Sequence, residues 1–254
     1  MRETPAGDFD YDKSKVDYAT IRKTDPRIGA LVRRSFGEAH SLLNVGAGAG
    51  SYEPLDIEVV AVEPSEQMRL QRPAHLTTAI DATAEALPFD DKSFDASLAS
   101  ITVHQWSDLE AGLQEMRRVT RGPIVILTFE PEQLKNYWLA GYVPEIMEIE
   151  SRRMPSFERL KAALGGSFSA SQVPIPLDCQ DGFAEAYYGR PEAFLDEPVR
   201  RAQSFWGFMD RDDEERCVAR LRDDLSSGAW DRTHGDLRHQ PHFAGSLYLI
   251  TAHS

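Results

Sequence analysis

The chain has 254 residues, with 28 Lys and Arg against 41 Asp and Glu, a formal net charge of −13 and two cysteines. This acidic balance argues against a nucleic-acid partner, because phosphate binding depends on clustered Lys and Arg. Cys179 and Cys217 form no C-x-x-C pattern, so neither a disulfide framework nor a thiolate metal site is expected. Without a long apolar run or a signal-like start, the sequence predicts a cytoplasmic protein with no membrane partner.

Strand and helix patterns alternate along the first half of the chain, as a doubly wound sheet requires. An amphipathic helix is predicted within residues 25–40, followed by strands at 41–45 and 58–62. A short helix from Ser65 and a strand near 77–80 come next. These elements predict the first three strands of a mostly parallel sheet.

The pattern continues in the second half. A fourth strand is predicted at 94–100, and a capping box at 107–110 begins the next helix. The continuous apolar run at 124–129 is typical of a central buried strand. Helical pieces are expected at 131–152 and 156–164.

The last two strands are predicted at 171–179 and 246–252, which makes seven strands in all. Between them lies a long helical insertion at 181–243 that carries several aromatic residues. No clean linker divides the chain, so a single α/β domain over residues 1–254 is expected, with the insertion as a candidate lid.

A glycine-rich stretch follows the first strand and indicates a nucleoside-bearing cofactor. Gly46, Gly48 and Gly50 allow the backbone to approach a ligand, and Glu63, at the tip of the second strand, can accept two hydrogen bonds from a ribose diol. A dinucleotide fingerprint would need a glycine where Ser51 stands and a long helix after it. The short connector therefore favours a ligand without phosphates, such as S-adenosylmethionine. The alternative is a glycine turn with a purely structural role.

A third segment, TAEALPFDDKSFD from Thr83 to Asp95, precedes the fourth strand. Together with the glycine stretch and Glu63, in this order, it resembles the class I S-adenosylmethionine-dependent methyltransferases, in their small-molecule, ubiquinone/menaquinone-type branch. The resemblance covers roughly residues 40–130. It implies a Rossmann-like methyltransferase fold, whose last two strands pair antiparallel at the sheet edge.

The resemblance also implies the cofactor contacts. Glu63 would hold the ribose, the glycines would hold the amino-acid end, and the residues before Leu87 would read the adenine edge, with Leu87 and Phe89 against its ring. An opening segment, residues 1–24, would fold over the cofactor. The expected contacts are Tyr18, Arg22, Asn44, Gly46, Ala47, Gly48, Gly50, Glu63, Pro64, Met68, Asp81, Thr83, Ala84, Glu85 and Ser100.

The roles of two of these residues, Asn44 and Arg22, have alternative interpretations. Asn44 stands where the family usually has an acid, and an amide accepts hydrogen bonds but supplies no charge. Arg22 would either pair with the methionine carboxylate or remain a solvated surface residue.

The acceptor is expected to be a small molecule, because residues 100–106 lack the Asn/Asp-Pro-Pro-aromatic motif of the family's amino-methylating DNA and RNA members. His104 follows the fourth strand and is the candidate general base, with a structural role as the alternative. Trp106 is expected to pack. His234, His239 and His242 lie in a polar stretch that a solvated loop explains better than a metal site, so no metal is expected.

Methyl transfer from S-adenosylmethionine by in-line displacement is the predicted function. Two alternatives stand beside it. The fold could bind the cofactor without transferring methyl, as a cyclase-like relative or a pseudoenzyme. A nicotinamide-dependent oxidoreductase on a similar sheet is the second, although the glycine spacing opposes it.

Overall fold

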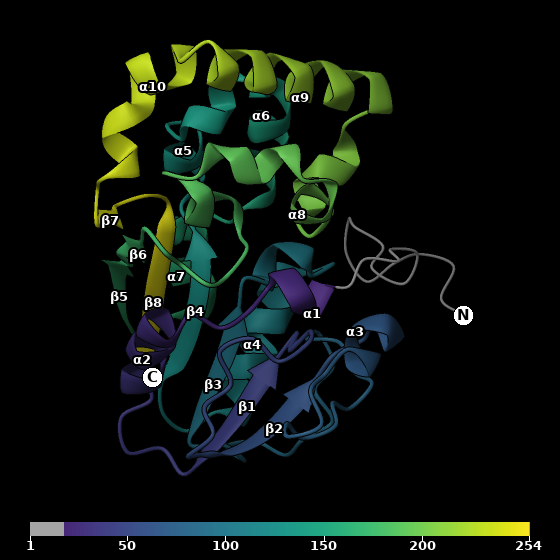
Figure 1. Ribbon diagram of the computed structural model, residues 1–254. Coiled ribbons are helices and arrows are strands. Elements are labelled where there is room, and N and C mark those ends of the chain that lie inside the picture. Colours follow the sequence, from purple (N-terminus) through teal and green to yellow (C-terminus); the bar gives the residue numbers. More distant parts are fainter. Residues whose placement is uncertain (1–17, 254) are drawn as a thin grey trace.

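The computed structural model describes residues 18–253 and has a six-stranded sheet at its centre (Figure 1). Its strands, in spatial order, are β2 (Glu58–Val62), β1 (Ser41–Val45), β3 (Ala96–Ser100), β4 (Ile124–Phe129), β8 (Leu247–His253) and β5 (Ser167–Gln172). Strands β1 to β4 are mutually parallel, and β8 runs antiparallel to β4 and β5. The doubly wound, mostly parallel α/β fold is confirmed, and so is the antiparallel pair at its edge.

The predicted count of seven strands is wrong. The strand expected at 77–80 is reduced to one bridge between Val62 and Ile80. The carbonyl of Thr77 instead accepts hydrogen bonds from Arg72 Nε and Nη2, over 3.0 and 2.9 Å, and is therefore not part of a ladder.

The strand predicted at 171–179 is also displaced. Strand β5 ends at Gln172, two residues before Pro174, which has no backbone N–H to continue the ladder. The chain then pairs β6 (Ile175–Pro176) with β7 (His242–Phe243) as a separate two-stranded sheet.

Helices cover both faces of the main sheet. Helix α2 (Pro26–Ser35) packs on one face, and α4 (Leu109–Val119) and α7 (Phe157–Leu164) pack together on the other. All six side chains of β4 are buried, and they alternate between the two cores, as the two-residue period of a strand requires. Asp108, and not the predicted Ser107, caps α4, because the Ser107 hydroxyl donates to Glu85 instead.

A helical layer stands above the carboxyl ends of the parallel strands (Figure 1). Two stretches of chain build it: one follows β4, and the other lies between β6 and β7. The first contains α5 (Pro131–Leu134), η2 (Trp138–Gly141) and α6 (Pro144–Arg153). The second contains η3 (Ala184–Tyr187), η4 (Pro191–Leu195), α8 (Glu197–Arg201), η5 (Ser204–Phe208), α9 (Arg211–Ser226), α10 (Ala229–His234) and η6 (Gly235–Arg238).

Most aromatic side chains of this helical layer form its own core. Trp138 packs edge-on against Phe194 and Trp230, with ring centroids 5.6 and 5.5 Å apart. His234 lies 5.4 Å from the Trp230 ring, so this histidine belongs to the packing of the layer.

Three short helices lie near the sheet's upper edge: α1 (Tyr18–Ile21), α3 (Glu66–Leu70) and η1 (Val103–Gln105). Among the helices of residues 18–253, none is both long and apolar enough to cross a bilayer.

Candidate functional site

The segments that follow β1 and β3 meet at one edge of the sheet. Strand β1 lies between β2 and β3, so the chain leaves β1 in one direction and returns to β3 on the other side. This reversal of strand order opens a crevice at the carboxyl ends, where open α/β sheets bind ligands. The glycine turn, residues 46–50, lies at that point.

Positive backbone dihedrals explain the glycines of this turn. Gly46, Gly48 and Gly50 have φ values of 66°, 51° and 97°, in the left-handed region that side chains disfavour. Space is also restricted, because a Cβ at Gly46 would lie 2.3 Å from Thr102 Oγ1. The Ala47 N–H donates to the Val62 carbonyl over 2.9 Å, which fixes the turn against β2.

Glu63 faces the glycine turn. Its carboxylate accepts hydrogen bonds from the Gly48 N–H over 2.7 Å and from the Ser65 N–H over 2.8 Å. Burial raises the pKa of Glu63, and the two amide donors oppose that shift. The structure thus brings the predicted ribose acid and the glycine turn into direct contact.

The two acids expected near the adenine, Asp81 and Glu85, have different partners. Asp81 is exposed and forms an ion pair with Arg69 at 3.3 Å. Glu85 accepts hydrogen bonds from Ser107 Oγ over 2.8 Å and from the Asp108 N–H over 3.1 Å. Both carboxylates therefore have protein partners.

The other predicted contacts differ in burial. Met68 is buried, with its methyl group 3.2 Å from where a Gly48 Cβ would lie. Ala84 is buried, whereas Pro64, Thr83 and Ser100 are half-buried.

Two side chains expected near the adenine ring serve the core instead. Leu87 is buried in the core on the α4 side of the sheet. Phe89 packs edge-on against Phe94, with ring centroids 5.0 Å apart. Trp106 packs on Gly112, as expected for a structural residue.

Two cofactor contacts were predicted near the N-terminus, Tyr18 and Arg22. Tyr18 is the first residue of α1, but its side chain lies outside the described part of the structure. Arg22 is buried, and its Nε donates to Asp181 Oδ1 over 2.6 Å. The Tyr52 hydroxyl donates to the other oxygen of Asp181 over 2.8 Å. The solvated alternative for Arg22 is therefore wrong, and the carboxylate it contacts belongs to the insertion.

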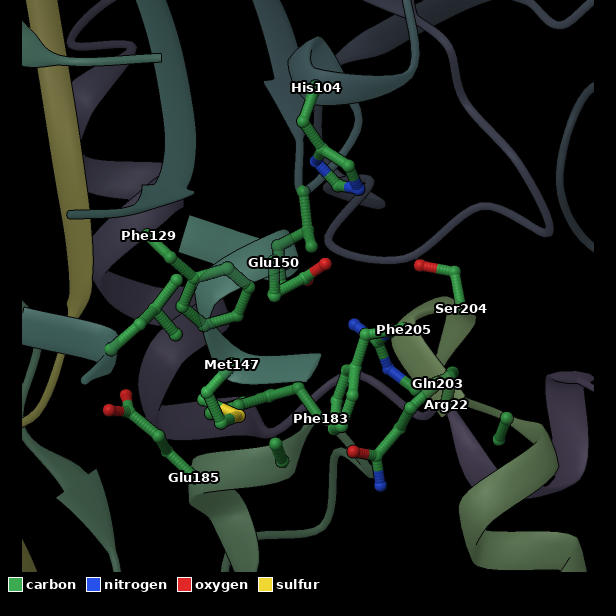
Figure 2. Close-up of a pocket in the computed structure, with 14 residues that line it drawn as sticks. Arg22, His104, Phe129, Met147, Glu150, Phe183, Glu185, Gln203, Ser204 and Phe205 are labelled. Atoms are coloured by element: carbon green, nitrogen blue, oxygen red, sulfur yellow. The ribbon is translucent and has the colours of Figure 1, made fainter. Parts of the chain in front are cut away.

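A pocket, which we call the chamber, lies between the sheet edge and the helical layer (Figure 2). Arg22, His104, Glu150, Gln203 and Ser204 supply polar groups around it. The remainder of its lining consists of Ile101, Phe129, Leu134, Met147, Phe183, Ala184, Glu185, Ala202 and Phe205. Such a mixture, apolar with a few polar groups, is typical of small-molecule sites.

His104 points into the chamber from η1 (Figure 2). Burial lowers the pKa of His104 to about 3, and the nearby guanidinium groups of Arg153 and Arg22 add to the shift. The imidazole is therefore neutral at neutral pH. Its position fits the predicted catalytic role, whereas its basicity is too low for an efficient general base at that pH.

Two further acids border the chamber. Glu150 is buried and forms an ion pair with Arg153, which also donates to Ser204 Oγ over 3.2 Å. Glu185 is buried and accepts the Ser246 N–H. Burial raises the pKa of Glu185 to about 7. In Figure 2 its carboxylate points away from the centre of the chamber, which indicates a structural role.

Two residues that line the chamber, Ile101 and Gln203, were not predicted from the sequence. Ile101, directly after β3, has a φ of 51°, a strained value for a β-branched residue of a kind that concentrates at functional sites. Gln203 donates from Nε2 to the Val199 carbonyl, and its buried Oε1 has no hydrogen-bond partner within residues 18–253. No local pattern marks either residue, because each depends on the packing of distant segments.

Comparison with known proteins agrees with this geometry. Residues 43–123 match the model of a methyltransferase domain family. A crystal structure from Anabaena variabilis, described as a methyltransferase from an antibiotic biosynthesis pathway, shares 31% sequence identity. The match covers 92% of this chain and 99% of that protein, with a TM-score of 0.85.

The chain belongs to the class I S-adenosylmethionine-dependent methyltransferases.

Two curated relatives each match half of this chain. A demethylmenaquinone methyltransferase of Beutenbergia cavernae is 31% identical over 50% of this chain and 58% of its own length. A malonyl-[acyl-carrier protein] O-methyltransferase of Halorhodospira halophila is 29% identical over 50% of this chain and 48% of its own length. The chain thus spans about half the length of the curated relatives it matches.

The residues of the methyltransferase fit the cofactor of its family. Glu63 offers a buried carboxylate beside the turn, and the left-handed glycines leave the backbone uncovered there. The turn carries no long helix behind it, which suits a cofactor without phosphates. Neither the family match nor the relatives support the nicotinamide alternative.

Proposed function

We propose that this methyltransferase transfers the methyl group of S-adenosylmethionine to a small organic acceptor held in the chamber. The observation that carries the proposal is the segment after β3, which contacts both parts of the site. Thr102 lies against Gly46 of the glycine turn, while Ile101 and His104 line the chamber. The two ligands would therefore meet across residues 101–104.

The protein's contribution is binding, orientation and exclusion of water. When bound at the turn, S-adenosylmethionine supplies a methyl group that is already activated for transfer, so positioning can provide most of the acceleration. Glu63 would bind the ribose hydroxyls, and the glycine turn would hold the amino-acid end. Residues of the helical layer line the chamber and would help to keep water away from the reacting groups.

His104 acts in this proposal as a neutral hydrogen-bonding group that orients the acceptor. A residue whose pKa lies near 3 removes a proton poorly at neutral pH. The preferred acceptors are therefore those whose reacting atom needs no deprotonation by histidine, such as carboxylates, amines, or phenols that are already ionised.

The lining of the chamber restricts the polarity of the acceptor. Phe129, Met147, Phe183 and Phe205 offer apolar surface to a ring or a short branched chain. The acceptors named for the curated relatives, demethylmenaquinone and malonyl-acyl carrier protein, differ in chemistry. We therefore propose only that the acceptor is a small molecule with an apolar body, and the turnover screen identifies the attacked atom.

The test is a turnover screen of phenols, carboxylic acids and amines with S-adenosylmethionine. Release of S-adenosylhomocysteine, together with a methylated product, is expected only when an acceptor that fits the chamber is present. Binding of S-adenosylmethionine without turnover of any class would favour the alternative of a non-transferring protein. Thermal stabilisation by NAD, and not by S-adenosylmethionine, would contradict the proposal.

A further inference from the structure

Three buried side chains meet beneath the glycine turn. Asn44, on β1, donates from Nδ2 to Glu53 Oε1 over 2.8 Å. Arg72 Nη2 donates to both carboxylate oxygens of Glu53, over 2.9 Å each. The side chains of Glu53 and Arg72 are 1% and 3% exposed, and Asn44 is equally buried. The group is therefore shielded from water and from salt screening.

Arg72 also contacts the glycine turn itself. Its Nη1 donates to the Gly48 carbonyl over 3.4 Å, while the Gly48 N–H donates to Glu63 over 2.7 Å. The other end of the guanidinium is held by the Thr77 carbonyl. Gly48 is thus fixed on one side by Glu63 and on the other by Arg72. A displaced Arg72 would move the backbone groups that form the cofactor cradle.

This arrangement explains the amide at position 44. A carboxylate only accepts hydrogen bonds, so an Asp there would place two carboxylates at the 2.8 Å separation that now joins Asn44 and Glu53. Two carboxylates this close in a buried site repel each other when both are ionised, so one of them would be protonated at a higher pH than usual. Asn44 Oδ1 is buried and has no hydrogen-bond partner among the described residues, so the polar contact of this amide is its donation to Glu53.

We propose that Glu53 and Arg72 are positioning residues of the cofactor site. Their ion pair supplies a buried carboxylate from the connector after the glycine turn, and Arg72 holds the Gly48 carbonyl in place. Asn44 is then the required complement of Glu53. The inference rests on the proposed function, because it concerns the turn that would bind S-adenosylmethionine.

Calorimetric titration with S-adenosylhomocysteine tests the inference without any acceptor. Asn44→Asp is expected to weaken binding about tenfold or more, because two carboxylates then share one buried site. Glu53→Gln is expected to weaken it about threefold to tenfold, because Arg72 loses its counter-charge. The double variant Asn44→Asp/Glu53→Gln restores one carboxylate, one amide and the original net charge, so its affinity should return to within about threefold of the wild type.

Two readouts separate positioning from a general loss of structure. The binding defect of Asn44→Asp, relative to wild type at the same pH, should shrink as the pH is lowered from 8 to 6, since one of the paired carboxylates then retains a proton. Asp56→Asn, which removes the exposed partner of Arg33, is the matched control and should leave affinity unchanged. Thermal unfolding checks that each variant is folded, and the double variant and Glu53→Gln still decide the matter if Asn44→Asp does not fold.

Wild-type affinity in either single variant, or a double variant that binds no better than the singles, would overturn the inference. Failure of the wild-type protein to bind S-adenosylhomocysteine would instead contradict the proposed function.

Discussion

The cofactor side of the site and the chamber are built in different ways. The cofactor side takes its central groups from one short stretch, the glycine turn and Glu63, and much of its chemistry comes from backbone N–H groups and left-handed glycines. The chamber gathers side chains from at least five separate segments, between Arg22 and Phe205. A site made of local backbone has a sequence motif, whereas a site made of converging side chains has none.

Glu63, the acid beside the glycine turn, also differs in its partners from the charged groups around the chamber. Glu63 is stabilised by two backbone amides. Around the chamber, Arg22 and Arg153 are each paired with a carboxylate, Asp181 and Glu150. Substitutions on the cofactor side should therefore change ligand affinity, whereas those around the chamber should change stability, pH dependence or acceptor choice.

The largest effect is expected from Asp181→Asn. This change removes the counter-charge of a buried arginine and should reduce the free energy of unfolding by about 3 kcal/mol or more, measured by urea denaturation. The matched control is Asp178→Asn, which breaks an exposed ion pair with Arg27 and should cost less than about 1 kcal/mol. Equal losses in the two variants would show that the buried Arg22–Asp181 pair contributes no more to stability than the exposed Arg27–Asp178 pair.

Glu63→Ala should act on the cofactor side alone. The loss of a charged hydrogen-bond acceptor is worth about 1.5–3 kcal/mol, so affinity for S-adenosylhomocysteine should fall roughly 10- to 150-fold in a calorimetric titration. Cys179→Ala is the control, because this buried thiol belongs to the core on the α2 side of the sheet and does not contact Glu63, and it should leave affinity unchanged. Equal affinity in both variants would remove Glu63 from the cofactor site.

His104→Asn should change the acid sensitivity of the fold. The folded pKa of about 3 lies below the ordinary value of 6.5, so the unfolded chain binds more protons between these pH values. Wild-type stability therefore falls as pH decreases through this window, and His104 accounts for about 2 kcal/mol of the loss between pH 7 and pH 5. The variant should lose less stability over that range in urea titrations, whereas His75→Asn, at an exposed position, should behave as the wild type.

The smallest effect is expected from Gln203→Leu. Gln203 lines the chamber and its buried Oε1 has no partner within residues 18–253, so an acceptor that brings a second hydroxyl or N–H group to this atom would satisfy it. The substitution should raise KM about tenfold for such acceptors. Acceptors that lack such a group should be unaffected, and stability should change by less than about 1 kcal/mol. Initial rates with matched pairs of acceptors give the comparison, and a uniform change across each pair would exclude this role for Gln203.

The sequence by itself determined the glycine turn. The spacing of Gly46, Gly48 and Gly50 between two apolar strands predicted it, and Glu63 was expected at the tip of the second strand, where the structure has it in contact with Gly48. Both follow from local backbone geometry, since left-handed glycines and strand ends depend on near neighbours in the chain. Continuous apolar runs likewise located β1, β2 and β4 within the sheet.

Tertiary structure decided everything that depends on distant partners. Arg22 is buried because Asp181, far along the chain, reaches it. The neutral state of His104 follows from burial and two arginines on other elements. Side-chain pairing and desolvation act through space, so no local pattern records them.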